Sequence, residues 1–146
     1  MDFDSSMKIS ASGLSANRTW INVLATNLAN ANTTRTADGT PYARKTLIVE
    51  STPISDEMGT NFGSALQNEL QKVEVSEILP DGRGFREVYD PGNPDADAKG
   101  IVQMPNINPV EEMASLASAS RSYEANLAAL QTAKQLALKA IDIGAK

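Results

Sequence analysis

Both ends of this chain carry apolar residues at the spacing of a long amphipathic helix. Near the N-terminus, Met7, Leu14, Ile21 and Leu28 lie one heptad apart, and Leu24 occupies an intermediate position on the same face. Near the C-terminus, a three-four alternation is formed by Met113, Leu116, Tyr123, Leu127, Leu130, Ala137 and Ile141. Leaving such a stripe in water costs about 25 cal/mol for each Å² of apolar surface, so each helix must bury its stripe against a partner. The two end segments are therefore predicted to be helices that partner each other or neighbouring molecules.

The C-terminal helix has the clearest start in the chain. Asn108 can cap it, Pro109 suits its first position, and Glu111 and Glu112 in the first turn favour the positive end of the helix dipole. The pattern runs to Gly144, a residue type that commonly ends helices. Such a helix is roughly 50 Å long at 1.5 Å per residue, too long to be buried within a chain of this size. We expect it to need neighbours.

The N-terminal helix is expected to begin at one of the serines at positions 5 and 6 and to run to about Asn30. The Asn- and Thr-rich run that follows ends it, because these side chains compete for backbone hydrogen bonds. Asn27 and Asn30 are open to two interpretations. Either they set the register of paired helices through buried amide hydrogen bonds, as single polar residues do in coiled coils, or they form an ordinary polar helix end.

The segment between the helices is predicted to be rich in short strands. Residues 42–50, 70–79, 85–89 and 101–104 have strand character, a turn is expected at 36–39, and Pro53 is expected to close the first strand. The predicted fold class is α+β, with long N- and C-terminal helices forming a coiled-coil-like pair and a small β-rich middle domain. The boundaries divide the chain into an N-terminal axial helix with its Asn-rich end (1–35), the middle domain (36–107) and a C-terminal axial helix (108–146).

The helical stripes also allow two arrangements, an isolated helical hairpin or an assembly of many subunits. Small residues occur on several faces of the C-terminal helix, and they permit close approach on more than one side, which favours assembly. The residues expected to form the assembly interface are Met7, Leu14, Ile21, Leu24, Asn27, Leu28, Asn30, Met113, Leu116, Tyr123, Leu127, Leu130, Ala137 and Ile141.

Composition argues against several classes of function. The net charge of −5 and the scattered basic residues argue against a nucleic-acid partner, because phosphate binding requires clustered Lys and Arg. The chain has no Cys and no His, which removes thiol chemistry, the commonest general base near neutral pH and the commonest transition-metal ligand. We therefore expect no enzyme activity, no cofactor, no metal and no small-molecule substrate.

Two motifs invite a binding or catalytic interpretation that their details disfavour. The stretch from Asp95 to Gly100 resembles the start of a calcium loop, but Lys99 stands where an oxygen ligand is needed, and Asn106 stands where the bidentate Glu belongs. A solvated loop is the better interpretation. The adjacent acidic pairs, such as Glu111 and Glu112, point in different directions and have no converging groups, so they do not form a general acid/base pair.

The N-terminus begins Met1-Asp2-Phe3-Asp4, which is acidic where a secretory signal is basic, and no stretch approaches the length of a membrane span. A protein with this sequence that leaves the cytoplasm is expected to use a route without a cleaved signal peptide.

Several segments resemble the bacterial flagellar rod and hook proteins, and within that family the proximal-rod proteins most closely. The resemblance extends over both ends and the segment before the second helix, whereas residues 51–85 match poorly. Two departures are Ile101, where an aromatic is expected, and Pro109, where an aliphatic residue is usual. The matching segments are Ser12-Gly13-Leu14-Ser15-Ala16, Asn22 to Thr33, Tyr89 to Asp97, Gly100, Met104 to Asn108, Glu111-Glu112-Met113, Ser118 to Tyr123, Ala125-Asn126, Thr132-Ala133-Lys134 and Ile141 to Gly144.

The resemblance implies a structural subunit of the proximal rod of the flagellar basal body, polymerised through its terminal helices into the shaft that transmits motor torque. It also implies a periplasmic location reached through the flagellar type III export apparatus. The implied partners are further copies of the chain, other proximal and distal rod proteins, that apparatus and a rod-capping protein. Two alternatives remain: another rod component, or a helical-hairpin export chaperone or adaptor, which would also be small, acidic and heptad-patterned.

Overall fold

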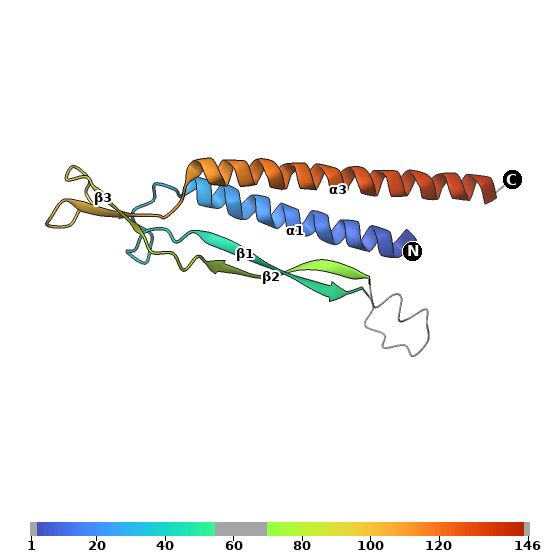
Figure 1. Ribbon diagram of the computed structural model, residues 1–146, viewed down its shortest axis with the longest axis horizontal. Coiled ribbons are helices and arrows are strands. Elements are labelled where there is room, and N and C mark those ends of the chain that lie inside the picture. Colours follow the sequence, from blue (N-terminus) through green and yellow to red (C-terminus); the bar gives the residue numbers. More distant parts are fainter. Residues whose placement is uncertain (1–2, 55–69, 145–146) are drawn as a thin grey trace.

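The computed structural model describes residues 3–54 and 70–144. Its elements are α1 (Phe3–Ala29), β1 (Lys45–Pro53), β2 (Gln71–Pro80), β3 (Arg86–Tyr89), β4 (Ile101–Met104) and α3 (Pro109–Gly144). Figure 1 shows an elongated molecule in which α1 and α3 lie side by side and run in opposite directions. The hairpin of β1 and β2 follows α1 on its other side, and β3 and β4 lie at the end opposite both termini. The predicted α+β class is confirmed.

The start of α3 lies where the sequence predicted it and is capped by Asn108. The side-chain Oδ1 of Asn108 accepts a hydrogen bond from the backbone N–H of Val110 at 3.1 Å, and its carbonyl accepts one from the N–H of Glu112 at 3.0 Å. The helix then continues for 36 residues to Gly144. By contrast, α1 begins at Phe3, before the two serines, so neither is its cap, and Ser5 is buried instead.

The β1–β2 hairpin is antiparallel, with Lys45 paired to Pro80 at one end and Pro53 paired to Gln71 at the other. The register shifts between Ile48 and Val49, whose partners are Glu77 and Val75, so Ser76 is the extra residue of a β-bulge. The first strand was predicted to begin at residue 42 and to end before Pro53. It begins three residues later, because Tyr42 turns inward and groups with Ala31 and Ile107 in a small core.

The β3–β4 hairpin is closed by the loop that resembles the start of a calcium site. In this loop, Oδ1 of Asp97 accepts hydrogen bonds from the N–H groups of Lys99 (2.8 Å) and Ile101 (2.9 Å). Gly100 has φ of 78°, and a Cβ on it would lie 3.0 Å from the ring of Tyr89, so this position requires glycine. Among the described residues, no group of three or more His, Cys, Asp or Glu is placed to hold a metal ion.

The helix α1 is covered on two sides. On one side it meets α3 closely: a Cβ built on Gly13 would lie 3.0 Å from Nδ2 of Asn126. On the other side, Oγ of Ser12 accepts a hydrogen bond from the backbone N–H of Val73 in β2 at 3.1 Å. Leu24, only 1% exposed, is the largest apolar side chain fully buried in the described residues. Within residues 3–54 and 70–144, neither helix is long and apolar enough to cross a membrane.

Candidate assembly surface

A cluster of buried and half-buried polar side chains lies where the two helices meet the open end of the β1–β2 hairpin. We call it the base cluster; it consists of Asn27, Tyr42, Arg44, Asp81 and Glu112. Asn27 is completely buried and lies at its centre. Its Nδ2 donates to the carbonyl of Lys45 (2.9 Å) and to Oε2 of Glu112 (3.3 Å), while its Oδ1 accepts from Oη of Tyr42 (3.1 Å) and from the N–H of Lys45 (2.9 Å). Every hydrogen-bonding group of this amide is therefore satisfied.

Glu112 extends the base cluster from α3 toward the hairpin. It is 3% exposed, and its Oε1 accepts a charge-assisted hydrogen bond from Nε of Arg44 at 2.7 Å. Nη1 of Arg44 lies 3.2 Å from Oδ2 of Asp81, and the two residues are also joined through their backbones, with the N–H of Asp81 donating to the carbonyl of Arg44 at 2.6 Å. A buried carboxylate needs such partners, because an unpaired one is strongly destabilising. The cluster joins α1, α3 and both strands at the open end of the hairpin.

Two acidic or phenolic groups of the base cluster titrate away from their ordinary ranges. Burial raises the pKa of the Tyr42 hydroxyl above 10.0, and the negative charge of Glu112 adds to this effect. The pKa of the Asp81 carboxyl is lowered, chiefly by hydrogen bonds from the side chain and backbone of Arg83, with a smaller contribution from Arg44. The same pairing raises the pKa of Arg83. Tyr42 is therefore held neutral and Asp81 is held charged at neutral pH.

The stripe of α3 that is buried within the subunit differs in part from the stripe predicted for assembly. The buried or half-buried stripe has three-four spacing and contains Glu112, Leu116, Ala119, Tyr123, Asn126, Leu130, Ala133 and Ala137. Leu116, Tyr123, Leu130 and Ala137 belong to both the observed and the predicted stripe. The observed stripe has Glu112 in place of Met113 and Asn126 in place of Leu127. Met113 is therefore 57% exposed and Leu127 37% exposed on the adjacent face. The physical reason is close approach: Ala119, Asn126 and Ala133 let α3 approach Gly13 and the rest of α1 more closely than larger side chains would permit.

The predicted interface residues in α1 and at its end fall into three groups. On α1, Leu24 and Asn27 are buried inside the subunit, whereas Met7, Leu14, Ile21 and Leu28 are half-buried along the helix. Asn30 acts locally: its Nδ2 donates to the carbonyl of Thr26 at 2.9 Å, and its Oδ1 accepts from Oγ1 of Thr33 at 3.1 Å. Asn27 therefore makes buried amide hydrogen bonds, one of them to α3, as the first interpretation requires, whereas Asn30 makes the local hydrogen bonds of a polar helix end.

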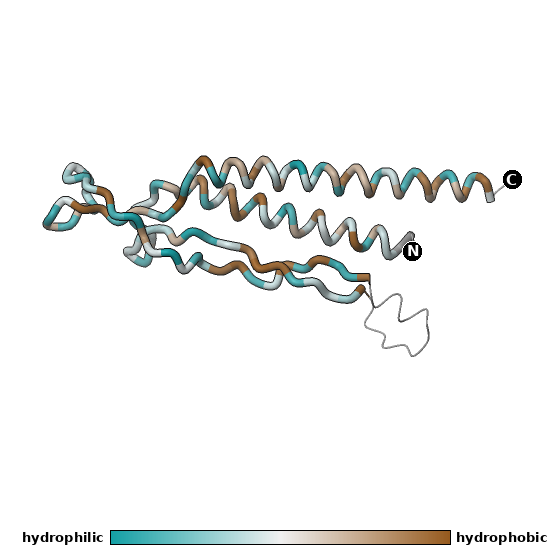
Figure 2. The backbone as a smooth tube through the Cα atoms, viewed as in Figure 1, coloured by the Kyte–Doolittle hydropathy of each residue, from teal (hydrophilic) through white to brown (hydrophobic). Residues whose placement is uncertain are grey.

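The last turns of α3 form a second exposed surface, which we call the α3 tip. Figure 1 shows α3 continuing past the beginning of α1, and Figure 2 shows that hydrophobic positions continue into these turns. Leu136, Leu138, Ile141 and Ile143 are 64%, 53%, 66% and 78% exposed. At helical spacing, Leu136 and Ile143 lie on one side of the helix and Leu138 and Ile141 lie on another, so apolar side chains are exposed on more than one side.

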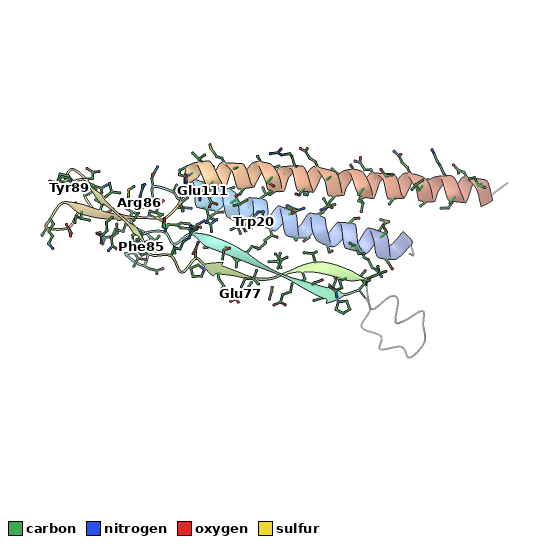
Figure 3. All side chains as sticks on the ribbon, viewed as in Figure 1. Trp20, Glu77, Phe85, Arg86, Tyr89 and Glu111 are labelled. Carbon is green, nitrogen blue, oxygen red and sulfur yellow. The ribbon has the colours of Figure 1, made fainter. Side chains whose placement is uncertain are left out.

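A groove of about 400 Å³ lies between the helix pair and the hairpin. Its apolar lining includes Ala16 and Trp20 of α1, Leu47 and Val49 of β1, and Val73 of β2. Figure 3 shows Trp20 between α1 and the hairpin. The groove and the α3 tip both expose apolar surface. Exposed apolar patches on a folded protein usually mark interaction surfaces.

Sequence reasoning identified only Asn27 among the members of the base cluster and missed the other four, Tyr42, Arg44, Asp81 and Glu112. Glu112 was interpreted only through its position in the first turn of α3. The available signal was its spacing: it lies four residues before Leu116 and therefore on the same face as a predicted interface residue.

Two regions of the chain match known protein families. Residues 7–35 match the family described as "Flagella basal body rod protein", and residues 98–143 match "Flagellar basal body rod FlgEFG protein C-terminal". These regions contain most of α1 and all of β4 and nearly all of α3, and each contributes one residue, Asn27 or Glu112, to the base cluster.

The similarity to individual proteins extends over nearly the whole chain. The flagellar basal-body rod protein FlgC of Bacillus subtilis is 40% identical over 150 residues, which cover 95% of this chain and 96% of that protein. FlgC of Yersinia enterocolitica is 40% identical over 136 residues, with 93% of each chain covered. FlgC of Borreliella burgdorferi is 38% identical over 149 residues, with 98% of each chain covered.

Proposed function

Because the chain belongs to the FlgC family of flagellar basal-body rod proteins and is a structural subunit of that rod, we propose that it builds the proximal part of the rod by polymerising through its end helices. In this proposal the rod is the shaft that transmits motor torque to the rest of the flagellum. The comparisons favour this function over a helical-hairpin chaperone or adaptor.

The observation that carries this proposal is the exposed apolar surface of α3. Met113 and Leu127 lie on the flank of α3, and Ile141 lies at its tip; all three were predicted to belong to the assembly interface, and all three face solvent in the isolated subunit. Burial of one such side chain contributes about 1.5 to 3 kcal/mol, of which the part still exposed becomes available on assembly. Several such contacts per subunit, repeated along a shaft, supply the stiffness that torque transmission needs.

The other predicted interface residues divide by burial. Leu24 and Asn27 support the surface from within, by fixing how the subunit's own helices pair. Met7, Leu14, Ile21 and Leu28, together with Leu116, Tyr123, Leu130 and Ala137, are half-buried and keep part of their surface for neighbours. We propose that these residues contact adjacent subunits along the edges of the helix pair.

The proposed partners are further copies of the chain, the other proximal and distal rod proteins, and a rod-capping protein. The proposed route is the flagellar type III export apparatus, without a cleaved signal peptide, to the periplasmic part of the basal body. Support for these partners and this route comes from membership of the family. The boundaries at residues 35 and 107 remain a proposed division into axial helices and middle domain.

Cryo-electron microscopy of basal bodies from cells producing a tagged form of this chain tests the proposal. Tagged density in the proximal rod, with both end helices of each copy packed against neighbouring subunits, is the expected result. A tagged protein found only in soluble complexes of low, defined stoichiometry would instead favour the chaperone or adaptor. Density in the rod with the end helices facing solvent would keep the location but reject assembly through the helices.

A further inference from the structure

The contact between α1 and α3 has a repeating character that does not by itself fix how far one helix is shifted along the other. Gly13 lies opposite Asn126, and Asn27 lies opposite Glu112, fourteen residues away on each helix. The seam position of Asn126 recurs seven residues before and after it as Ala119 and Ala133. A slip of one heptad, about 10 Å along the helix axis, would therefore bring an alanine opposite Gly13 without a clash.

The base cluster is the part of the contact that such a slip would break. A slip in one direction places Ala119 opposite Asn27, and a slip in the other places Trp20 opposite Glu112. In both cases the hydrogen bond between the amide of Asn27 and the carboxylate of Glu112 is broken. These two residues are 0% and 3% exposed in the observed register. Burying polar groups without partners is strongly unfavourable, so the cluster discriminates between registers that the small residues tolerate.

Contacts from the β1–β2 hairpin also favour one register of α1 against α3. Arg44 immediately precedes β1, Lys45 is the first residue of β1, and Asp81 follows the end of β2. Arg44 reaches Glu112 of α3 through Nε and Asp81 through Nη1, while both backbone groups of Lys45 bond to Asn27 of α1. The hairpin can therefore seat its open end only when both helices are in one register.

We propose that Asn27, Arg44 and Glu112 form a register lock, a set of positioning residues that makes seating of the hairpin and alignment of α1 with α3 depend on each other. The lock fixes the length of α3 that extends beyond α1. A slip of one heptad would change this length by about 10 Å and would displace the α3 tip by the same distance relative to the hairpin. This inference concerns the folded subunit and holds whichever neighbours the subunit meets.

Disulfide trapping can report the register directly, because the chain has no cysteine of its own. The native-register reporter combines Gly13→Cys with Asn126→Cys; a Cβ at position 13 would lie 3.6 Å from the Cγ of Asn126, where the new Sγ would stand. The two slipped-register reporters combine Gly13→Cys with Ala119→Cys or with Ala133→Cys. Oxidation of the dilute full-length chain, followed by non-reducing electrophoresis and mass spectrometry, gives the fraction of intramolecular closure for each pair.

In the otherwise unchanged chain, the native reporter should close and the slipped reporters should stay open. Failure of the native reporter to close would overturn the proposal, because the free chain would then have no paired register to lock. The decisive variant is Asn27→Leu with Arg44→Met and Glu112→Leu, which replaces the lock by apolar side chains of similar size. We expect it to fold, because no buried charge is left unpaired, and to raise closure of the slipped reporters roughly tenfold.

Exclusive closure of the native reporter in this triple variant would overturn the proposal, because the seam alone would then set the register. If circular dichroism shows that the triple variant does not fold, the outcome depends on Arg44→Lys, which keeps the charge but has no Nε–H to donate to Glu112 while reaching Asp81. If Arg44→Lys raises the fraction of disulfide closure in the slipped-register reporters above that of the otherwise unchanged chain, the register lock is supported. If the fraction is unchanged, the register lock is refuted. Glu111→Leu, on the neighbouring exposed position, is the matched control and should leave all three reporters unchanged.

Discussion

The first and last turns of α3 are built in opposite ways. In the first turn, Glu112 is a charged side chain that is 3% exposed, and its carboxylate accepts hydrogen bonds from Asn27 of α1 and from Arg44, which precedes β1. In the last turns, Ile141 and Ile143 are large apolar side chains that are 66% and 78% exposed. The usual rule places apolar residues inside and charges outside, and α3 inverts it at both ends.

The difference separates what the subunit completes for itself from what it leaves to others. The base cluster has all of its partners within one chain: among the described residues, no buried side-chain nitrogen or oxygen lacks a hydrogen bond. The α3 tip has apolar surface on several sides and no part of α1 beside it (Figure 1). One end of the helix is therefore packed within the subunit, and the other end leaves apolar side chains exposed, where we propose that neighbouring subunits bind.

The largest expected effect on stability comes from substitution of Glu112. Glu112→Leu leaves the guanidinium of Arg44 and the amide of Asn27 without their buried acceptor, and we expect the free energy of unfolding to fall by about 3 to 5 kcal/mol. Urea titration followed by the fluorescence of Trp20, the single tryptophan, measures this loss. The control Glu111→Leu, at the adjacent exposed position, should change it by less than about 0.5 kcal/mol. Equal effects of the two substitutions would contradict the distinct role given to Glu112.

A matched pair of leucine truncations sharpens the comparison. Leu24→Ala removes a side chain that is 1% exposed next to the base cluster, and it should lower the free energy of unfolding by about 2 to 5 kcal/mol. Leu138→Ala removes the same atoms at the α3 tip, where the side chain is 53% exposed, and should change it by less than about 0.5 kcal/mol. Both values come from the same urea titration. A large loss for Leu138→Ala would show that the tip already packs within the subunit.

Tyr42 tests the base cluster through pH. Tyr42→Phe removes the hydrogen bond from the Tyr42 hydroxyl to Oδ1 of Asn27, but this oxygen still accepts a hydrogen bond from the N–H of Lys45. We therefore expect the free energy of unfolding to fall by about 1 kcal/mol at neutral pH. The pKa of Tyr42 is raised in the folded state, so folding favours the protonated hydroxyl. This contribution is complete below about pH 10 and declines as the pH rises through the raised pKa. The difference in unfolding free energy between the two proteins should therefore narrow above pH 10.

Urea titrations of both proteins at neutral pH and near pH 11 measure this change. Tyr89→Phe is the control at neutral pH, because Tyr89 is 74% exposed and its substitution should leave stability unchanged. A difference between wild type and Tyr42→Phe that stays constant across the alkaline range would argue against a Tyr42 hydroxyl whose ionisation is opposed by burial.

The smallest expected effect on stability belongs to the α3 tip. Replacing Leu136, Leu138, Ile141 and Ile143 together by Gln retains helix propensity and should leave the free energy of unfolding within about 0.5 kcal/mol. Incorporation of the tagged variant into basal bodies should nevertheless be lost, because the proposed contact surface has become polar. Replacement of the exposed Gln131, Gln135 and Lys139 by Ala provides the control. Normal incorporation of the first variant would remove the tip from the assembly surface.

Much of the fold could be predicted from local sequence signals, because those signals are produced by short-range physics. Asn108 and Pro109 specify a helix start through backbone hydrogen bonds within a few residues, and the structure places that start where it was expected. The strand at 101–104 was placed correctly for a similar reason. The β1 strand was shifted because Tyr42 is drawn into a core with Ile107, a residue far away in the sequence.

The interior of the helix pair could not be predicted in the same way. Two stripes on α3 share Leu116 and Tyr123, and hydrophobicity alone selects the one with the larger side chains, Met113 and Leu127. The observed stripe contains Glu112, whose burial depends on Arg44, 68 residues away, and on Asn27, 85 residues away. No periodicity in α3 reports these partners, and a charged residue on a helix face ordinarily indicates solvent.

The position of the two termini has a consequence for any polymer of this subunit. Both chain ends lie at one extremity of the molecule, and β3 and β4 lie at the other (Figure 1). Subunits stacked head to tail would all point the same way, so the filament would have directionality, with chemically different surfaces at its two ends. A protein that binds one end would then not recognise the other, and growth could be controlled separately at each.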